Sequence, residues 1–156
     1  MGITEEDFKK MQARVAGAVQ VAAEPVRPVL PAKFTIYGSA APVNNAKASF
    51  VQDGKIRTVK TPRGKEWADT AEKQLREQWG IMLPIEAETF FIVDVYRPRN
   101  AGDVDGYAKG ILDAFQAAGV IRNDSSIRRL TITKHVDSDR PRVEVVIYES
   151  TLKALR

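Results

Sequence analysis

The chain has no cysteine and only one histidine, His135, among its 156 residues. Without cysteine there is no disulfide framework, no thiolate metal site and no cysteine nucleophile. A single histidine also rules out a zinc cage built from several imidazoles. Any metal site must therefore use oxygen ligands, which favour magnesium or manganese.

Long hydrophobic runs are missing as well. No apolar stretch approaches the roughly 20 residues that a membrane-spanning helix needs, and the N-terminus lacks the hydrophobic core of a signal peptide. We therefore expect a soluble, cytoplasmic protein with no membrane partner. A length of 156 residues suggests one domain, large enough to bury about two-thirds of its unfolded surface.

The net charge of +4 decides little, but its distribution is informative. Basic residues lie on both sequence flanks of an acidic segment, which is typical of a track for a polyanion. Lysines and arginines also populate any solvated loop, so the pattern alone leaves that alternative open. The basic residues before the segment are Lys47, Lys55, Arg57, Lys60, Arg63, Lys65, Arg97 and Arg99, and those around its end are Arg122, Arg128 and Arg129.

The acidic segment itself, residues 102–124, carries a pattern suited to phosphate chemistry. Asp103 and Asp105 lie two positions apart, Lys109 follows one helical turn later, and Asp124 comes nineteen positions after Asp105. In an extended backbone, a D-x-D pair points both carboxylates at one cation. Lys109 would flank that cation without binding it. The pattern predicts a magnesium site that binds an anionic, oxygen-rich substrate.

Two other readings of the aspartates compete with this one. Asp105 is a good N-cap for a helix over residues 106–118, so both aspartates would simply cap a surface helix. A calcium-binding EF-hand is excluded, because the positions that need an oxygen ligand, a glycine and a glutamate hold Tyr107, Ala108 and Ala114.

The segment that follows the helix is only just long enough to bring Asp124 back to the aspartate pair. The helix over residues 106–118 spans about 20 Å, and the six residues from Gly119, the expected left-handed stop, reach about 20 Å when extended. Asp124 therefore meets the pair only if this segment runs back along the helix. Otherwise a second subunit must complete the site.

The stretch DVDGYAKGILDAFQAAGVIRNDSSI, residues 103–127, resembles the signature of the RusA family of Holliday junction resolvases. That signature carries D-x-D-N-x-x-K, an LDAL-like helix and an acidic pair before the next strand. Gly106 replaces the usual asparagine, and Asn123 replaces the first acid of the later pair. The family's catalytic positions fall on Asp103, Asp105, Lys109 and Asp124.

The resemblance extends from about Lys33 to Glu149. The APVNN segment, residues 41–45, is similar to the family's loop with a proline and paired asparagines, and Lys134 falls on a family lysine. Asn44 and Asn45 either bind phosphates or hold a tight turn. From the charge pattern and the resemblance together we expect DNA contacts from Asn44, Asn45, Lys47, Lys55, Arg57, Lys60, Arg63, Lys65, Arg97, Arg99 and Lys134.

The resemblance implies a homodimeric, structure-selective endonuclease that depends on Mg²⁺, with Mn²⁺ as a substitute. Its substrate would be branched DNA, especially four-way junctions. Paired cuts in opposite strands would leave 5′-phosphates and serve DNA recombination and repair. Two alternatives stay open: an endonuclease on other branched or duplex DNA, and a non-catalytic basic DNA-binding protein. Gly106 makes the second of these more credible.

The periodicities predict an α+β fold with a single mixed β-sheet and helices packed on it, in β-α-β-α-β-β order. Apolar residues on both faces of the strand over residues 85–96 predict a covered central strand. The last two strands are expected to form an antiparallel hairpin, and an Asp-Gly turn predicts a small hairpin over residues 50–59. The expected strands are residues 33–38, 85–96, 127–135 and 142–148, with a second helix over residues 62–78 capped by Thr61.

The chain divides into three segments on the same evidence. Residues 1–32 contain an amphipathic helix, over residues 4–23, and a proline-rich connector. Residues 33–150 form the RusA-like endonuclease domain, and residues 151–156 form a short tail.

Overall fold

The computed structural model describes residues 5–7, 9–10, 26–42, 47–100 and 102–150. Most of the predicted N-terminal helix and the C-terminal tail lie outside these ranges. Within them, no helix is both long and apolar enough to cross a membrane. The elements are β1 (Ala32–Tyr37), β2 (Lys47–Gln52), β3 (Lys55–Lys60), α3 (Pro62–Trp79), β4 (Thr89–Arg97), η1 (Asp105–Tyr107), α4 (Ala108–Ala117), η2 (Asp124–Ser126), β5 (Ile127–Val136) and β6 (Arg142–Glu149).

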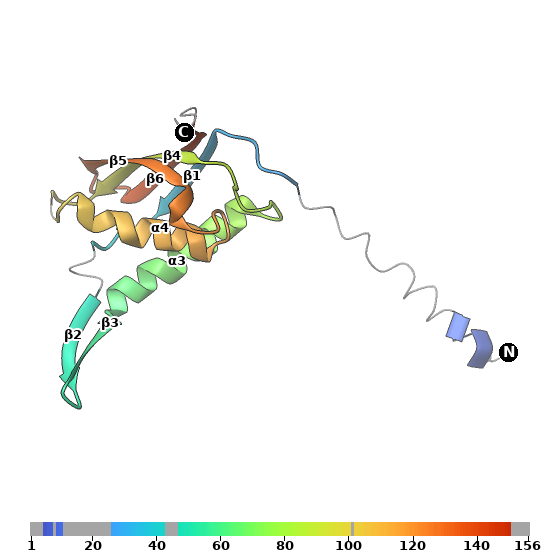
Figure 1. The fold of residues 1–156 in the computed structure, drawn as a ribbon, viewed down its shortest axis with the longest axis horizontal. Helices are drawn as coiled ribbons and strands as arrows, with labels where there is room; N and C mark the ends of the chain where they lie inside the picture. Colours follow the sequence, from blue (N-terminus) through green and yellow to red (C-terminus); the bar gives the residue numbers. More distant parts are fainter. Residues whose placement is uncertain (1–4, 8, 11–25, 43–46, 101, 151–156) are drawn as a thin grey trace, which may run out of the picture.

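Four strands form one mixed sheet in the order β1-β6-β4-β5 (Figure 1). β4 and β5 are parallel, while β6 is antiparallel to both β1 and β4. The mixed sheet confirms the predicted fold class. The predicted hairpin of the last two strands is wrong, because β4 lies between them. The crossover through α4 sets β5 parallel beside β4, and β6 pairs on the other side of β4.

Both helices of the domain, α3 and α4, lie on one face of the sheet (Figure 1). On that side Phe115 of α4 packs edge-to-face against Phe34, at 5.1 Å between ring centroids, and against Phe91, at 5.5 Å. Alternate residues of β4 point away from the helices, and Ile92 among them is 40% exposed. The expectation that β4 is covered on both faces is therefore wrong, since no helix of the described residues covers the second face.

Helix α3 begins and ends where its sequence predicts. The Thr61 side chain accepts a hydrogen bond from the Gly64 amide at 3.1 Å, and Gly80, with φ of +62°, ends the helix. Two glutamines of α3 also bond to the backbone of edge strand β1. Gln74 bonds to both peptide groups of Tyr37, and Gln78 bonds to both of Thr35. These bonds satisfy the backbone groups of Thr35 and Tyr37 on this edge of the sheet.

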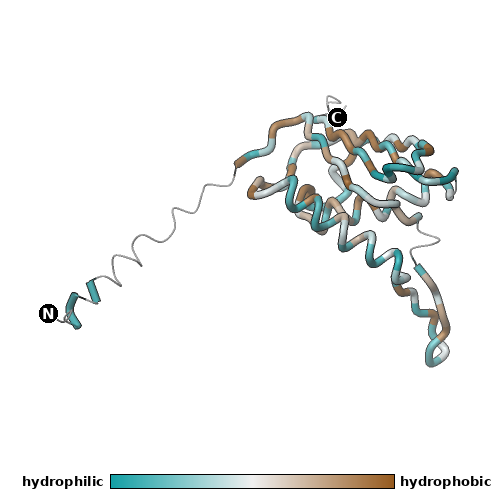
Figure 2. Tube along the Cα trace, turned by 180° about the vertical axis from the view of Figure 1, so that it is seen from behind, coloured by the Kyte–Doolittle hydropathy of each residue, from teal (hydrophilic) through white to brown (hydrophobic). Residues whose placement is uncertain are grey.

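Strands β2 and β3 form a separate two-stranded sheet, here called the arm, which projects from the domain beside the start of α3 (Figure 1). Its turn residues Asp53 and Gly54 both have positive φ, at 53° and 71°, as a tight two-residue hairpin turn requires. The predicted small hairpin is confirmed. Figure 2 shows apolar positions along the arm as well as in the domain.

Candidate active site

The acidic loop, residues 102–105, connects β4 to α4 and is anchored by Arg97. This arginine is the last residue of β4 on the helix-covered face and is 8% exposed. Its Nη1 donates hydrogen bonds to the Ala40 carbonyl at 2.9 Å and to the Tyr107 hydroxyl. Arg97 therefore ties the end of β4 to the end of η1 and to the segment after β1. The sequence predicts a DNA contact for Arg97, but its burial and its protein partners make it a structural residue.

Gly102 fixes the backbone at the start of the acidic loop. Its φ is +79°, and a Cβ at this position would lie 2.9 Å from the Tyr107 hydroxyl and 3.2 Å from Pro42 Cγ. Both the conformation and the space therefore require glycine. Lys134 of β5 donates from Nζ to the Gly102 carbonyl at 2.6 Å. This lysine, expected among the DNA contacts, is half-buried and holds the loop in place.

Asp103 and Asp105 are exposed. The backbone between them is not extended, because Val104 has helical dihedrals of −60° and −44°; strand alternation therefore does not place the two carboxylates. Neither aspartate caps the helix either, since η1 and α4 begin without a side-chain cap. The prediction that Asp105 is an N-cap is wrong, and capping no longer explains why the acids are there.

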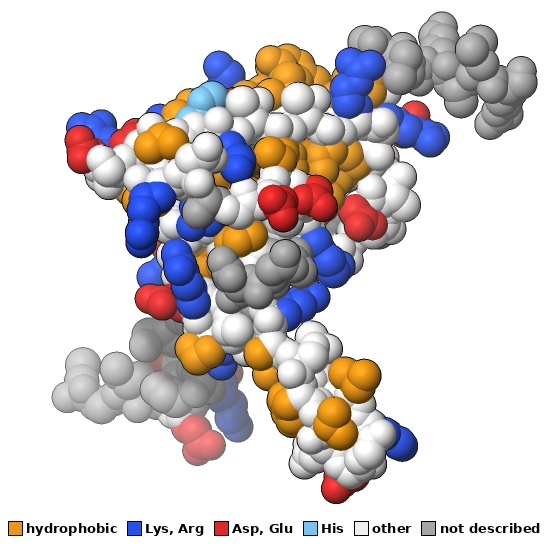
Figure 3. Space-filling view, turned by 90° about the vertical axis from the view of Figure 1, so that its left-hand side faces the viewer, with side chains coloured by type: hydrophobic (Ala, Val, Ile, Leu, Met, Phe, Trp, Pro, Cys, Tyr) orange, Lys and Arg blue, Asp and Glu red, His pale blue; other side chains and the backbone are white. Residues whose placement is uncertain are grey.

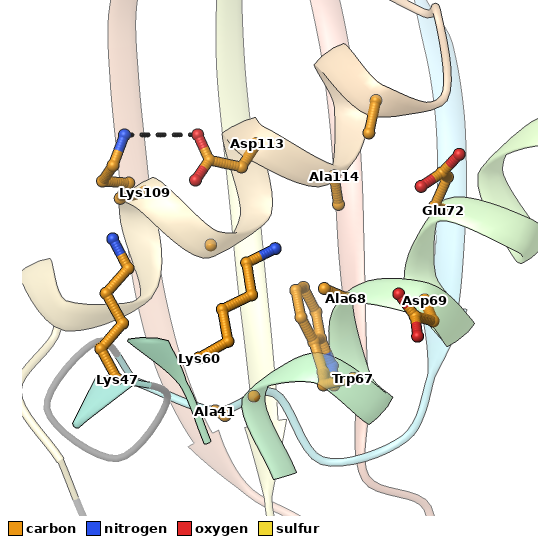
Figure 4. A pocket seen from close by; sticks show the side chains of 13 residues that line it. Ala41, Lys47, Lys60, Trp67, Ala68, Asp69, Glu72, Lys109, Asp113 and Ala114 are labelled. Carbon is orange, nitrogen blue, oxygen red and sulfur yellow. Dashed lines mark hydrogen bonds and ion pairs between the residues drawn. The ribbon is translucent and has the colours of Figure 1, made fainter. Parts of the chain in front are cut away.

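The α4 helix largely follows the prediction. Its apolar stripe, including Ile111 and Phe115, is buried, and Gly119 ends the segment with φ of +77°. The first predicted turn differs, because residues 105–107 form the 3-10 turn η1 and the α-helix proper begins at Ala108. Lys109 therefore lies in the first turn of α4, where its Nζ is 3.4 Å from Oδ1 of Asp113 (Figure 4).

Asp124 does not return to the aspartate pair within one chain. The segment before it is held near the start of β4, where the Ile85 amide donates to the Val120 carbonyl at 2.8 Å. Ile127, just after Asp124, pairs with Thr89 at the first residue of β4, whereas the acidic loop follows its last residue. β4 has nine residues, so its ends are roughly 26 Å apart at about 3.3 Å per residue.

The expected trio of carboxylates is therefore not assembled in one chain. Among the described residues, no group of three Asp, Glu, His or Cys side chains is placed to hold a metal ion. The donor chemistry still fits magnesium, which proteins commonly bind through one or two carboxylates plus substrate phosphates. Asp103 and Asp105 supply such oxygens, and among the described residues no hydrogen bond or ion pair engages their carboxylates.

A pocket lies between α3, α4 and the base of the arm (Figure 4). Lys47 and Lys60 extend into it from the arm, and Lys109 lies on its α4 side. Ala68 and Ala114 belong to its apolar lining, together with the ring of Trp67, and its acidic lining residues are Asp69, Glu72 and Asp113. Sequence reasoning missed this pocket, although the arm's register already pairs Lys47 with Lys60.

The other residues predicted to contact DNA come from several parts of the chain. Asn44 and Asn45 lie outside the described residues. Lys55 and Arg57 are exposed on the arm, Arg63 and Lys65 are exposed in the first turn of α3, and Arg99 is exposed just before the acidic loop. On the face shown in Figure 3, Lys and Arg side chains flank a small group of acidic ones above the arm.

The arginines near Asp124 are engaged by protein groups. Arg122 pairs with Glu86 at 2.8 Å, and Arg128 pairs with Glu88. The hydrogen bond from Arg128 holds the pKa of Glu88 below its usual range. Arg129 lies over the Phe90 ring, 5.1 Å from its centroid. Arg122 and Arg128 thus contribute less free positive charge than the sequence pattern suggested.

Comparison with known proteins decides the family. The family model for endodeoxyribonuclease RusA matches residues 39–148. The chain belongs to the RusA family. This match includes the arm, the acidic loop and the lysine-lined pocket, and it begins after the N-terminal segment.

Two relatives of the chain cover similar shares of it. A crossover junction endodeoxyribonuclease RusA from Aquifex aeolicus is 27% identical over 118 residues, which cover 74% of this chain and 90% of the relative. The uncharacterized protein YqaN from Bacillus subtilis is 28% identical over 142 residues, which cover 75% of this chain and 95% of the relative.

Proposed function

We propose that this protein is a magnesium-dependent endonuclease that resolves four-way DNA junctions in the cytoplasm, with Mn²⁺ as a substitute metal. Paired hydrolysis in opposite strands would leave 5′-phosphates and serve recombination and repair. The observation that carries the proposal is the acidic loop of a RusA-family chain. Asp103 and Asp105 are exposed on a backbone that Lys134 and Arg97 hold, next to a lysine-lined pocket.

The residues divide the chemical work as follows. Lys47, Lys60 and Lys109 attract the scissile phosphodiester and its neighbours to the pocket. Lys109 balances the charge that grows on the phosphorus centre, which is a preorganised electrostatic role. In the free chain its ammonium is paired with Asp113 at 3.4 Å, and both side chains are about half-exposed. An incoming phosphate therefore competes with Asp113 for Lys109.

Asp103 and Asp105 would supply oxygen ligands for the metal ion. When bound there, Mg²⁺ lowers the pKa of a water molecule and stabilises the leaving oxygen. The acidic loop contributes rigidity to this site. Tyr107 and Pro42 enclose Gly102, and Lys134 bonds to the Gly102 carbonyl. These contacts fix the backbone from which the two aspartate side chains extend.

The remote position of Asp124 leads us to propose a homodimer in which each site takes Asp124 from the second copy. A symmetric dimer also provides two sites for two cuts. Co-expressed Asp105→Asn and Asp124→Asn chains test this arrangement. If the site is shared, a mixed dimer keeps one intact site and nicks one strand of the junction, while each variant alone is inactive. If both residues act in the same chain, the mixture is inactive too.

A gel assay on a synthetic four-way junction, with and without magnesium, tests the main proposal. Paired, magnesium-dependent cuts in the junction, with little cutting of the matched duplex, are the expected result. Equal cutting of duplex would mean a less selective endonuclease. Binding without cutting, in either magnesium or manganese, would mean a non-catalytic DNA-binding protein.

A further inference from the structure

The arm has one face that changes character from tip to base. Its cross-strand pairs on this face are, in order, an apolar pair, a hydroxyl pair and an ammonium pair. The hydroxyls of Ser49 and Thr58 are hydrogen-bonded to each other at 2.8 Å. The three pairs are Val51–Ile56, Ser49–Thr58 and Lys47–Lys60.

The apolar pair at the tip is far more exposed than a protein normally leaves such residues. Val51 is 71% exposed and Ile56 is 78% exposed. They lie on either side of the tight turn, near the tip of the projecting arm (Figure 1). A paired apolar surface at the end of a projecting element marks an interaction site.

The base of the same face leads to the proposed active site. Lys47 and Lys60 line the pocket that also contains Lys109 (Figure 4). Val51 lies four positions after Lys47, so the lysine pair and the apolar pair are about 13 Å apart along the strand. That length corresponds to roughly four base-pair steps of 3.4 Å in duplex DNA.

Charge favours DNA over a second copy of the chain as the occupant. The arm carries four basic residues against a single carboxylate, that of Asp53, so two arms would repel each other. Lysine is also depleted at protein–protein interfaces. A two-stranded ribbon fits a DNA groove, and apolar side chains are known to wedge between base steps. The basic residues are Lys47, Lys55, Arg57 and Lys60.

We propose that the Val51–Ile56 pair inserts between bases next to the branch point of the DNA. The Ser49–Thr58 hydroxyls and the Lys47–Lys60 ammonium groups then hold the backbone of the strand that leads to Lys109. This inference rests on the proposed function. Insertion costs least where bases are already unpaired or unstacked, so the arm would favour a branch point over continuous duplex. It would thereby contribute to substrate selection without touching the acidic loop.

Fluorescence of 2-aminopurine tests the insertion. The probe base is placed either at the branch point of a synthetic four-way junction or four base pairs into one of its duplex branches. The full chain is then added without divalent cations. The test variant is Val51→Thr/Ile56→Thr, which keeps the β-branched shape that strands favour. The matched control is Ile81→Thr, which removes an apolar side chain that is 63% exposed beyond the far end of α3.

The wild type and Ile81→Thr should raise fluorescence at the branch point on binding, because the probe base unstacks. The double variant should lose most of this rise. It should also bind the junction about tenfold more weakly, as expected for the loss of one or two buried methylene equivalents, with duplex binding unchanged.

An unchanged fluorescence rise in the double variant would overturn the insertion. A change in dimer mass, measured by light scattering, would instead make the tip a protein–protein contact and would overturn it too. If the wild type neither binds nor cuts the junction, the proposed function fails first, and the insertion fails with it. Circular dichroism checks that the variant chains are folded.

Discussion

Lys134 donates a hydrogen bond from Nζ to the carbonyl oxygen of Gly102 at 2.6 Å, so the end of β5 holds the acidic loop that follows β4. Lys134→Met keeps the length of the side chain and removes this bond. We expect the cleavage rate to fall by about 10–100-fold, as is typical when a group that orients metal ligands is lost. Junction affinity should change little.

Binding measured against salt concentration separates the two roles of Lys134. If it contacts a phosphate, Lys134→Met should weaken binding to all DNA and reduce the salt dependence by about one charge. If it only holds the loop, the salt dependence should match that of the wild type. A variant with normal cleavage and weak binding would contradict the loop-holding role.

Gly102→Ala tests whether the fit against Tyr107 matters. Gly102 and Gly119 have nearly the same φ, +79° and +77°, but only Gly102 has neighbours within 4 Å of an added Cβ. Gly102→Ala and the matched control Gly119→Ala should each destabilise the protein by about 1 kcal/mol through backbone strain. Gly102→Ala should lose a further 1 kcal/mol or so from the contact with the Tyr107 hydroxyl. Urea denaturation measures both variants, and equal losses would show that the contact has no effect.

Arg97 and Arg99 should respond oppositely to substitution. Arg97→Gln removes a buried guanidinium that bonds to Ala40 and Tyr107, so we expect a loss of about 2–3 kcal/mol in the free energy of unfolding. Arg99 is exposed, so Arg99→Gln should leave stability within about 0.5 kcal/mol and weaken DNA binding at low salt. Thermal melts and binding isotherms distinguish them. Normal stability with weak DNA binding in Arg97→Gln would restore it as a DNA contact.

The sequence predicted the elements that local signals define. Helix α3 has a cap, a proline at its first position and a terminal glycine, and the arm has an Asp-Gly turn. Strand pairing was harder to predict. Two alternating strands joined by a short polar segment normally form a hairpin, but β6 pairs with β4 because the α4 crossover puts β5 on the other side of β4.

The candidate site was only partly predictable for a related reason. Spacing gives the reach of a chain but not its path, so it did not reveal that Ile85 holds the segment before Asp124 near the start of β4. Two signals in the sequence do point to the observed arrangement. Arg97 alternates with Val93 and Val95, which places it on the core face. A two-residue turn at Asp53 and Gly54 also fixes the register that pairs Lys47 with Lys60.

Asp137, in the turn before β6, should make stability depend on acid pH. Hydrogen bonds from the Arg140 amide and the Arg142 guanidinium hold the pKa of Asp137 below its usual range. Because the folded pKa is the lower one, the stabilisation is complete above the unfolded pKa, near 4, and is lost as pH falls through the folded value.

Asp137→Asn should therefore be less stable than the wild type at pH 7, with a difference that shrinks as pH falls below about 4. Urea unfolding at a series of pH values measures this. Asp139→Asn, an exposed neighbour, is the control and should stay within about 0.5 kcal/mol of the wild type. A stability gap that is constant with pH would contradict the role of the Asp137 carboxylate.

Asp105→Asn should abolish cleavage while junction binding persists. The change keeps the shape of the side chain but removes a negative charge that a metal ligand needs, so we expect the rate to fall by at least about a hundredfold. Binding should hold or strengthen, because a carboxylate repels the phosphates that the nearby lysines attract. Single-turnover cutting and a gel-shift titration measure the two effects, with Asp139→Asn as the control for simple loss of a carboxylate. Near wild-type cutting would remove Asp105 from the site. If binding and cutting were both lost, Asp105 would instead shape the loop. A residue that only binds the metal is not required for DNA to bind a basic surface.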